Sequence, residues 1–203
     1  MKQVKILSFI NLIFCTINSC FCQINDSWLI GMKDTNLILE TKFCNIVYSI
    51  DNNEEYSISW FNDTINNRSV AKFTILGNGF LEIESLKKEY IMLLQGVGQR
   101  EKIAVCLPIK KDAKEIIYEN LIDYDSINNI VITSNYDINR IDLKIINILT
   151  NKYLDIYILN VCTATCCIHC IKEIEYKHGE VLIKWYGKNN QEMKELYNIN
   201  SIF

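Results

Sequence analysis

The densest group of chemically reactive side chains lies near the C-terminal end of the sequence, at Cys162, Cys166, Cys167, His169 and Cys170. Thiolates and an imidazole at such close spacing can bind zinc or copper(I), so this segment permits a soft-metal site. Adjacent cysteines seldom both bind one tetrahedral zinc ion, and no second pair of matching spacing occurs elsewhere in the sequence. In an oxidising compartment the same cysteines form disulfides instead. We therefore expect disulfides in this segment and no metal.

The sequence offers few groups for catalysis. Its two histidines, His169 and His178, both lie in the cysteine-rich tail. The sequence has neither a Gly-x-Ser-x-Gly nor a His-Glu-x-x-His motif, and we interpret Gly96 and Gly98 as part of a turn rather than a phosphate-binding loop. We expect a protein that is not an enzyme and that has no cofactor.

The first twenty-two residues have the layout of a cleaved secretory signal. A short basic start at Met1–Lys5 precedes an apolar run from Ile6 to Ile17, and Cys20-Phe21-Cys22 places small side chains before a cut ahead of Gln23. The apolar run is too short to cross a bilayer, and no later stretch is long enough to do so. We expect a secreted, extracellular protein without an integral membrane segment; the alternative is a short anchor that is never cut.

Secretion places the remaining cysteines in an oxidising compartment and exposes the Asn-x-Ser/Thr sequons to glycosylation. The sequence has 9 cysteines, and removing Cys15, Cys20 and Cys22 leaves an even set of six, for which disulfides are the expected state in an oxidising compartment. These six are Cys44, Cys106, Cys162, Cys166, Cys167 and Cys170. Sequence alone does not select among their pairings. Sequons at Asn25, Asn62 and Asn67 are candidate glycosylation sites in exposed loops.

The composition indicates enough apolar residues for a sizeable core and no excess of one charge that would favour a charged partner. The net charge is −3, with acids and bases mixed along the chain, and no basic stripe suggests a nucleic acid partner. Hydrophobic residues make up 49% of the sequence, and one Pro and seven Gly argue against a disordered chain.

Hydrophobic periodicity predicts mostly strands. From Cys44 to Leu107 the apolar residues recur at every second position, which predicts six strands joined by short connections in an antiparallel meander. Further strands are expected at 130–133, 153–159 and 180–186. Between them, Ile138, Ile141, Ile145, Ile146 and Leu149 fall at helical spacing, so we expect one amphipathic helix over roughly 137–150.

This order of elements resembles a lipocalin of the apolipoprotein D and bilin-binding branch. Trp28 stands near the expected mature start, the stretch from Cys44 to Ser49 is similar to the second strand of that branch, and 90–107 is similar to a later strand pair. The resemblance implies an all-β fold: an eight-stranded antiparallel up-and-down barrel over 23–162 with one packed α-helix, followed by a Cys-rich extension over 163–203. It also implies a Cys44–Cys162 disulfide and a barrel floor closed by Trp28.

A hollow barrel would bind a small hydrophobic ligand of the lipid, retinoid, haem or bilin class. The inward, ligand-binding set given by the alternation is Tyr48, Tyr56, Ile58, Trp60, Phe73, Ile75, Leu81, Ile83, Tyr90 and Met92. The alternative is a secreted interaction or effector protein with a solid core that acts through its surface, or through a protein partner bound at 163–203. The two hypotheses differ in whether the inward side chains enclose a void or contact one another.

Overall fold

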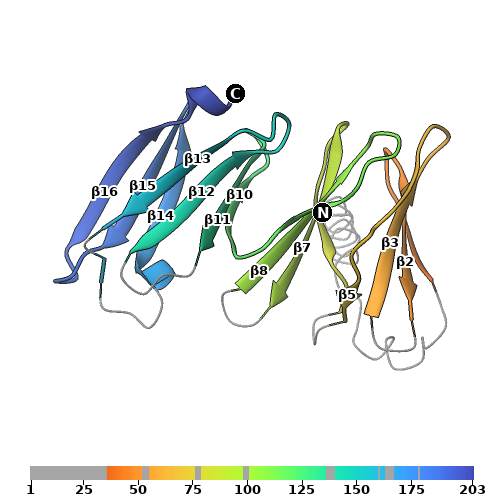
Figure 1. The fold of residues 1–203 in the computed structure, drawn as a ribbon, viewed down its shortest axis with the longest axis horizontal. Coiled ribbons are helices and arrows are strands. Elements are labelled where there is room, and N and C mark those ends of the chain that lie inside the picture. Colours follow the sequence, from red (N-terminus) through yellow and green to blue (C-terminus); the bar gives the residue numbers. More distant parts are fainter. Residues whose placement is uncertain are drawn as a thin grey trace, which may run out of the picture.

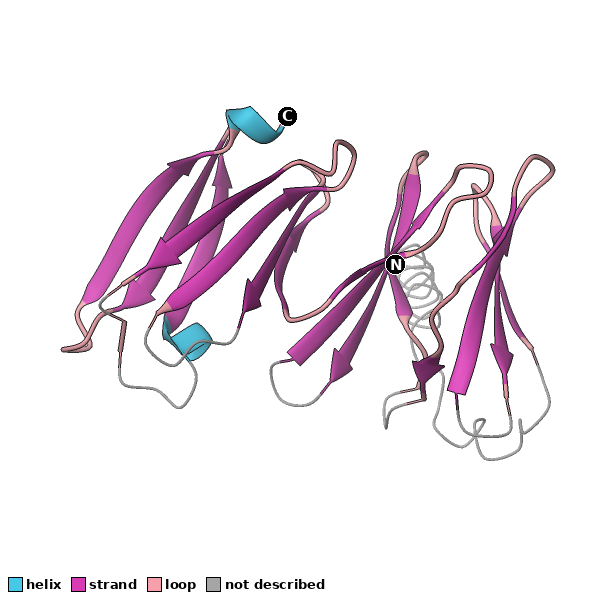
Figure 2. Cartoon of the chain, viewed as in Figure 1, coloured by secondary structure: helices cyan, strands magenta, loops and turns pink. Residues whose placement is uncertain are grey.

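The computed structural model describes residues 36–51, 55–75, 79–97, 101–135, 140–159, 161–162, 167–177 and 179–203. These residues form an all-β protein of antiparallel strands, as predicted, with two short 3-10 turns, η2 (Cys167–Cys170) and η3 (Asn200–Ile202), as the helical elements of the described part (Figure 2). The expected signal segment 1–22 lies outside the described residues.

The strands form four open sheets that follow one another along the chain. Sheet I has the order β1-β2-β3-β4, with β5 also paired to β3, and contains β1 (Leu37–Glu40), β2 (Asn45–Ile50), β3 (Glu55–Phe61), β4 (Asn66–Arg68) and β5 (Phe73–Thr74). Sheet II contains β6 (Glu82–Leu86), β7 (Tyr90–Val97), β8 (Glu101–Pro108) and β9 (Ile116–Tyr118). Sheet III contains β10 (Leu121–Asp125), β11 (Ile130–Asn135), β12 (Ile141–Asn147) and β13 (Tyr153–Ile158). Sheet IV contains β14 (Ile171–Lys177), β15 (Glu180–Tyr186) and β16 (Glu192–Asn198).

Three apolar cores hold these sheets in the layer order I, II, III, IV (Figure 1). The first core lies between sheets I and II and contains Trp60 and Leu93. The last core lies between sheets III and IV and contains Ile145 of β12 and Ile183 of β15. The middle core joins sheets II and III through Met92. The chain is therefore a pair of β-sandwiches, I–II and III–IV, packed against each other.

Strand β7 shows that sheet II is covered by an apolar core on each of its two faces. Ile91 and Leu93 contact the core between sheets I and II, whereas Tyr90 and Met92 contact the core between sheets II and III. All four side chains are buried, so this strand is apolar on both faces. A continuous apolar run of this kind is typical of a strand covered on both sides.

The helix predicted over 137–150 is wrong, because 141–147 forms β12. This strand pairs with β11 and with β13 in unbroken register. Ile141, Leu143 and Ile145 are buried at every second position, which is strand periodicity, while Ile146 contacts the opposite core. An isoleucine-rich stretch buried on both faces matches the helical period as well as the strand period, so the spacing alone misled the prediction.

The described strands do not form the predicted eight-stranded closed barrel, because they divide into four open sheets. The two sandwiches meet between β9 and β10, and 171–198 supplies sheet IV, which shares a core with sheet III. The expected domain boundary at residue 162 stays a prediction. Alternation reports which side chains face inward, but it does not report which sheet they face.

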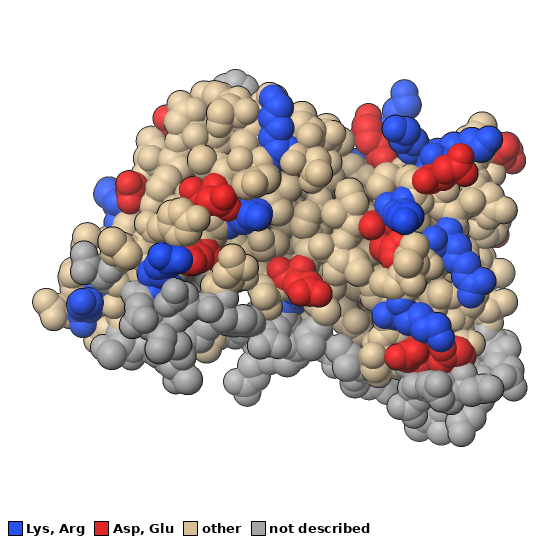
Figure 3. Space-filling view, viewed as in Figure 1, with Lys and Arg blue, Asp and Glu red and all other residues tan. Residues whose placement is uncertain are grey.

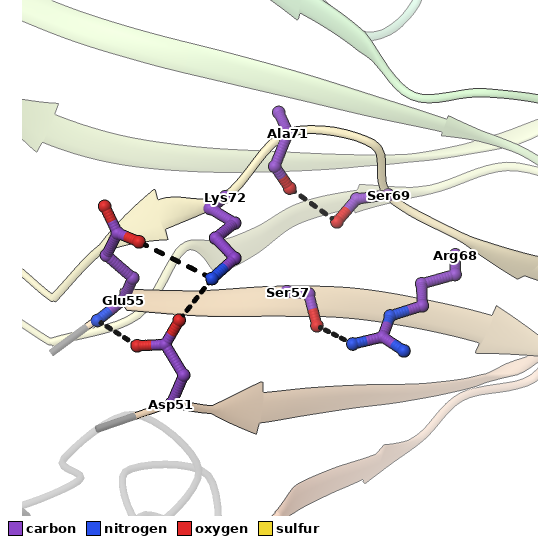
Figure 4. A network of polar contacts seen from close by, with 7 residues as sticks. All are labelled: Asp51, Glu55, Ser57, Arg68, Ser69, Ala71 and Lys72. Carbon is purple, nitrogen blue, oxygen red and sulfur yellow. Dashed lines mark hydrogen bonds and ion pairs between the residues drawn. The ribbon is translucent and has the colours of Figure 1, made fainter. Parts of the chain in front are cut away.

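Polar contacts fasten the loops of sheet I to its strands (Figure 4). The Lys72 Nζ lies 2.5 Å from Asp51 Oδ2 and 3.8 Å from Glu55 Oε2, which ties the start of β5 to the β2–β3 connection. Ser69 Oγ donates to the Ala71 carbonyl at 2.8 Å and accepts the Ile58 N–H at 3.0 Å. These contacts hold the segment between β4 and β5 against β3.

Candidate functional site

The predicted inward side chains are packed against one another in two apolar cores. Eight of them share the core between sheets I and II: Tyr48, Tyr56, Ile58, Trp60, Phe73 and Leu81 are buried, and Ile75 and Ile83 are partly buried against them. Tyr90 and Met92 lie on the opposite face of sheet II, in the core shared with sheet III. The set that the alternation placed around one cavity therefore belongs to two packed cores.

Hydrogen bonds hold the polar atoms of this aromatic core in place. Tyr48 Oη donates to the Leu81 carbonyl at 2.8 Å, and the Leu81 N–H donates to Tyr56 Oη at 3.0 Å. Both rings also contact Phe80, with centroid distances of 5.2 and 4.9 Å. Burial raises the pKa of Tyr56 to about 12, so the phenol stays protonated at neutral pH.

The cysteines pair differently from the expectation. Cys162 bonds to Cys170, with a Cα–Cα distance of 5.7 Å, so the expected Cys44–Cys162 disulfide is wrong. Cys44 lies in the core of the first sandwich and Cys162 at the edge of the second, which separates them by whole sheets. Cys44 and Cys106 are free and buried, and they belong to cores on opposite sides of sheet II.

Burial also makes the two free thiols poor nucleophiles. It raises the pKa of the Cys106 thiol to about 12, and it raises the pKa of Cys44 despite a hydrogen bond with Thr41 that acts in the opposite direction. Within the described residues, no group of three or more His, Cys, Asp or Glu side chains is placed to hold a metal ion. Cys167 lies in η2 and His169 is exposed beside it, whereas Cys166, His178, Trp28 and Asn25 lie outside the described residues.

The two described sequons have opposite environments. Asn62 is exposed in the β3–β4 turn, where its Oδ1 accepts the Thr64 N–H at 2.8 Å. Asn67 is only 5% exposed, and its Nδ2 donates to the Lys110 carbonyl at 2.8 Å. The Asn62 side chain is open to solvent, with its Nδ2 donating to the Phe43 carbonyl at 2.9 Å, whereas the amide nitrogen of Asn67 is enclosed.

A cluster that the sequence did not single out joins the two sandwiches. Ser85 Oγ lies 2.5 Å from Tyr124 Oη, which in turn lies 3.2 Å from Tyr90 Oη. Tyr90 Oη also donates to Asn129 Oδ1 at 2.8 Å. Ser85 and Tyr90 belong to sheet II, whereas Tyr124 and Asn129 belong to β10 and the turn after it. Their pairing depends on the sheet order, which no local sequence signal reports.

The strongest candidate for a functional surface is the outer face of the β12–β13 hairpin. In antiparallel sheets, directly opposite residues lie on the same face, so the pairs Asp142–Tyr157 and Lys144–Asp155 point away from sheet IV. Tyr153, Tyr157 and Leu159 are 57%, 60% and 63% exposed. We call Arg140, Asp142, Lys144, Tyr153, Tyr157 and Leu159 the β12–β13 face.

Cations lie over both exposed rings of this face. The Arg140 guanidinium carbon lies 5.1 Å from the ring centroid of Tyr157, and the Lys144 Nζ lies 4.4 Å from that of Tyr153. Arg140 Nε also lies 2.6 Å from Asp142 Oδ1. These contacts hold the tyrosines against the sheet. Tyrosine and arginine are the residues that protein interfaces use most as anchors.

The outer surface of sheet IV is a different kind of surface. A groove of about 430 Å³ there is lined by Lys172, Glu173, Lys184, Glu192, Met193 and Lys194. Lys184 is paired with Glu173 and Glu175, and Lys172 is paired with Glu192. Charges of both signs are also interspersed over the face of the molecule in Figure 3. Such a mosaic offers no single-sign site for an anion or a cation.

Comparison of the chain with protein-family models, curated proteins and solved structures found no match. The lipocalin resemblance therefore stays a prediction, and the open sheets do not provide the closed barrel that it implies. In the described part of the chain, no helix has the length and apolarity needed to cross a membrane.

Proposed function

We propose that the chain is an exported interaction protein that binds another protein through the β12–β13 face. The observation that carries this proposal is the packing of the first core, where the expected ligand-binding side chains Tyr48, Tyr56 and Trp60 are 0% exposed and contact their neighbours. A carrier of a hydrophobic ligand would need these side chains to separate. The surface hypothesis needs no such change.

The chemistry of the face supports a protein partner. Tyr153 and Tyr157 present rigid, amphipathic rings, and the cations over them leave the phenol oxygens available to a partner. Exposed aromatic side chains beside an arginine combine apolar area with directional hydrogen bonds. Lys144 and Asp155 lie between the two tyrosines and Asp142 lies opposite Tyr157, so the face carries charges of both signs, which favours selectivity over tight binding of one charge type.

Site-specific photo-crosslinking tests this proposal. A photo-reactive phenylalanine analogue replaces Tyr157 in one protein, and in the control it replaces Ile127, which is 84% exposed in the β10–β11 turn. Each secreted protein is incubated with intact cells. From position 157 we expect one discrete crosslinked protein of the cells, other than a second copy of the chain, competed by the unlabelled chain, and none from position 127. Equal labelling from both positions would contradict a specific face.

Native mass spectrometry distinguishes the carrier hypothesis. A native mass excess of a small molecule that disappears on denaturation would contradict the surface hypothesis, because the packed core has to open to hold it.

Tyr153→Ala and Tyr157→Ala provide the second arm of the crosslinking test: both side chains are more than half exposed, so the fold tolerates their loss. We expect Tyr153→Ala to reduce crosslinking from position 157, Tyr157→Ala to compete less well when added as the unlabelled chain, and neither variant to change the thermal transition.

A further inference from the structure

The edges of the described sheets are protected in nearly every case. Strands β1, β4, β5 and β9 have 4, 3, 2 and 3 residues, so they offer little edge to a further strand. Strands β6, β10 and β14 each carry a shift in register. Strand β16 carries Glu192, Lys194 and Glu195. Short, bulged and charged edges are the means by which proteins prevent unwanted strand pairing.

Strand β13 is the exception in the described part of the chain. It is 6 residues long, and its pairing with β12 runs without a shift. Its sequence Tyr-Leu-Asp-Ile-Tyr-Ile contains one charge, at Asp155, and no Lys, Pro or Gly. No described strand pairs with its second edge. A regular edge with few charges favours the addition of another strand.

We propose that β13 pairs antiparallel with β13 of a second copy of this chain. A two-fold axis at Ile156 places Asp155 opposite the second copy's Tyr157, and Tyr153 opposite its Leu159. No charged residue then faces a like charge. An axis at Asp155 would instead place two carboxylates directly opposite each other, which is unfavourable. Of these two registers, the position of the single charge favours the axis at Ile156.

The same register matches the faces of the two sheets. Ile156 and Ile158 lie on the side of β13 that contacts sheet IV, whereas Tyr153 and Tyr157 lie on the outer side. A two-fold axis perpendicular to the sheet keeps both sides aligned, so buried residues continue into buried residues. Two β12–β13 faces then join into one continuous surface across the axis.

Sedimentation velocity of the full chain over a range of concentrations tests the proposal. We expect a reversible monomer–dimer equilibrium, together with slower hydrogen exchange of the β13 amides at high concentration. A monomer at every concentration would overturn the proposal. So would a dimer whose β13 amides exchange as in the monomer, because the contact would then lie elsewhere.

A charge pair at position 157 tests the register. Tyr157→Asp places a carboxylate opposite Asp155 of the second copy, twice in each dimer, and should raise the dissociation constant about two- to thirty-fold. Tyr157→Lys places an ammonium group there and should lower it. Ile127→Asp is the exposed control and should leave it unchanged. Equal effects of Asp and Lys at position 157 would overturn the register, and circular dichroism of each variant excludes misfolding as their cause.

Discussion

Tyr48 and Tyr56 both form hydrogen bonds with the backbone of Leu81, and replacing them tests whether the first core is free of water. Tyr48 Oη donates to the Leu81 carbonyl, and the Leu81 N–H donates to Tyr56 Oη. Both tyrosines are 0% exposed, and Leu81 is 2% exposed. Replacing either tyrosine with Phe keeps the ring but leaves one backbone group of Leu81 buried without a partner.

The expected cost follows from that loss. An unsatisfied buried backbone group costs about 1–3 kcal/mol. For a chain of this size, a loss of about 2 kcal/mol lowers the melting temperature by roughly 4–8 °C. The double variant should cost less than the sum of the two single variants, because Leu81 released on one side can turn its remaining polar group toward water.

Urea unfolding of Tyr48→Phe, Tyr56→Phe and the double variant measures these costs. Tyr153→Phe is the matched control, since that ring is 57% exposed, and its effect should stay within about 0.5 kcal/mol. If both buried variants were as stable as the control, water would have to replace the lost hydroxyl groups. The core would then be hydrated, and the argument for a solid interior would fail.

Three further predictions concern protons, thiols and glycans. The Tyr56 pKa rises from 10.0 in the unfolded chain to about 12 in the fold, so the folded state holds this proton more tightly, and about 3 kcal/mol of stability should be lost as the pH rises from 10 to 12. Because burial also raises the pKa of Tyr48, the check is to compare urea midpoints of the wild type and Tyr56→Phe across that range, and an equal fall in both would contradict it. Cys44 and Cys106 should resist alkylation in the native protein and react fully in denaturant, as mass spectrometry of labelled peptides would show. In chain secreted from eukaryotic cells, glycosidase-sensitive mass should be present at Asn62, lost in Thr64→Ala and kept in Thr64→Ser; an unmodified Asn62 would contradict the expectation.

The sequence predicted that the fold is all-β and predicted much of the buried set, because alternation is a local property. Tyr48, Tyr56 and Trp60 are buried on the face that the alternation indicated. The helix over 137–150 failed because Ile145 and Ile146 are both covered, by different sheets, and adjacent isoleucines on two faces imitate helical spacing.

The candidate surface was less predictable than the core. Tyr153 and Tyr157 lie in a strand that the alternation did predict, but their exposure depends on how far sheet II covers sheet III, which is a property of the layers. The Cys162–Cys170 disulfide joins residues close in sequence, but the choice among the cysteines required the path of the chain between sheets III and IV.

The short connection between the two sandwiches affects how a partner would be bound. Only Glu119 and Asn120 lie between β9 and β10, and the Asn120 carbonyl accepts the Ser134 N–H at 3.1 Å. Tyr90 and Tyr124 are also in contact between the two sandwiches. The short connection and these contacts together restrict rotation of one sandwich relative to the other. The orientation of the two sandwiches is fixed when the chain folds. Binding of a partner therefore costs no further entropy for ordering one sandwich relative to the other. A partner seated on β13 would thereby be held at a set angle to the first sandwich.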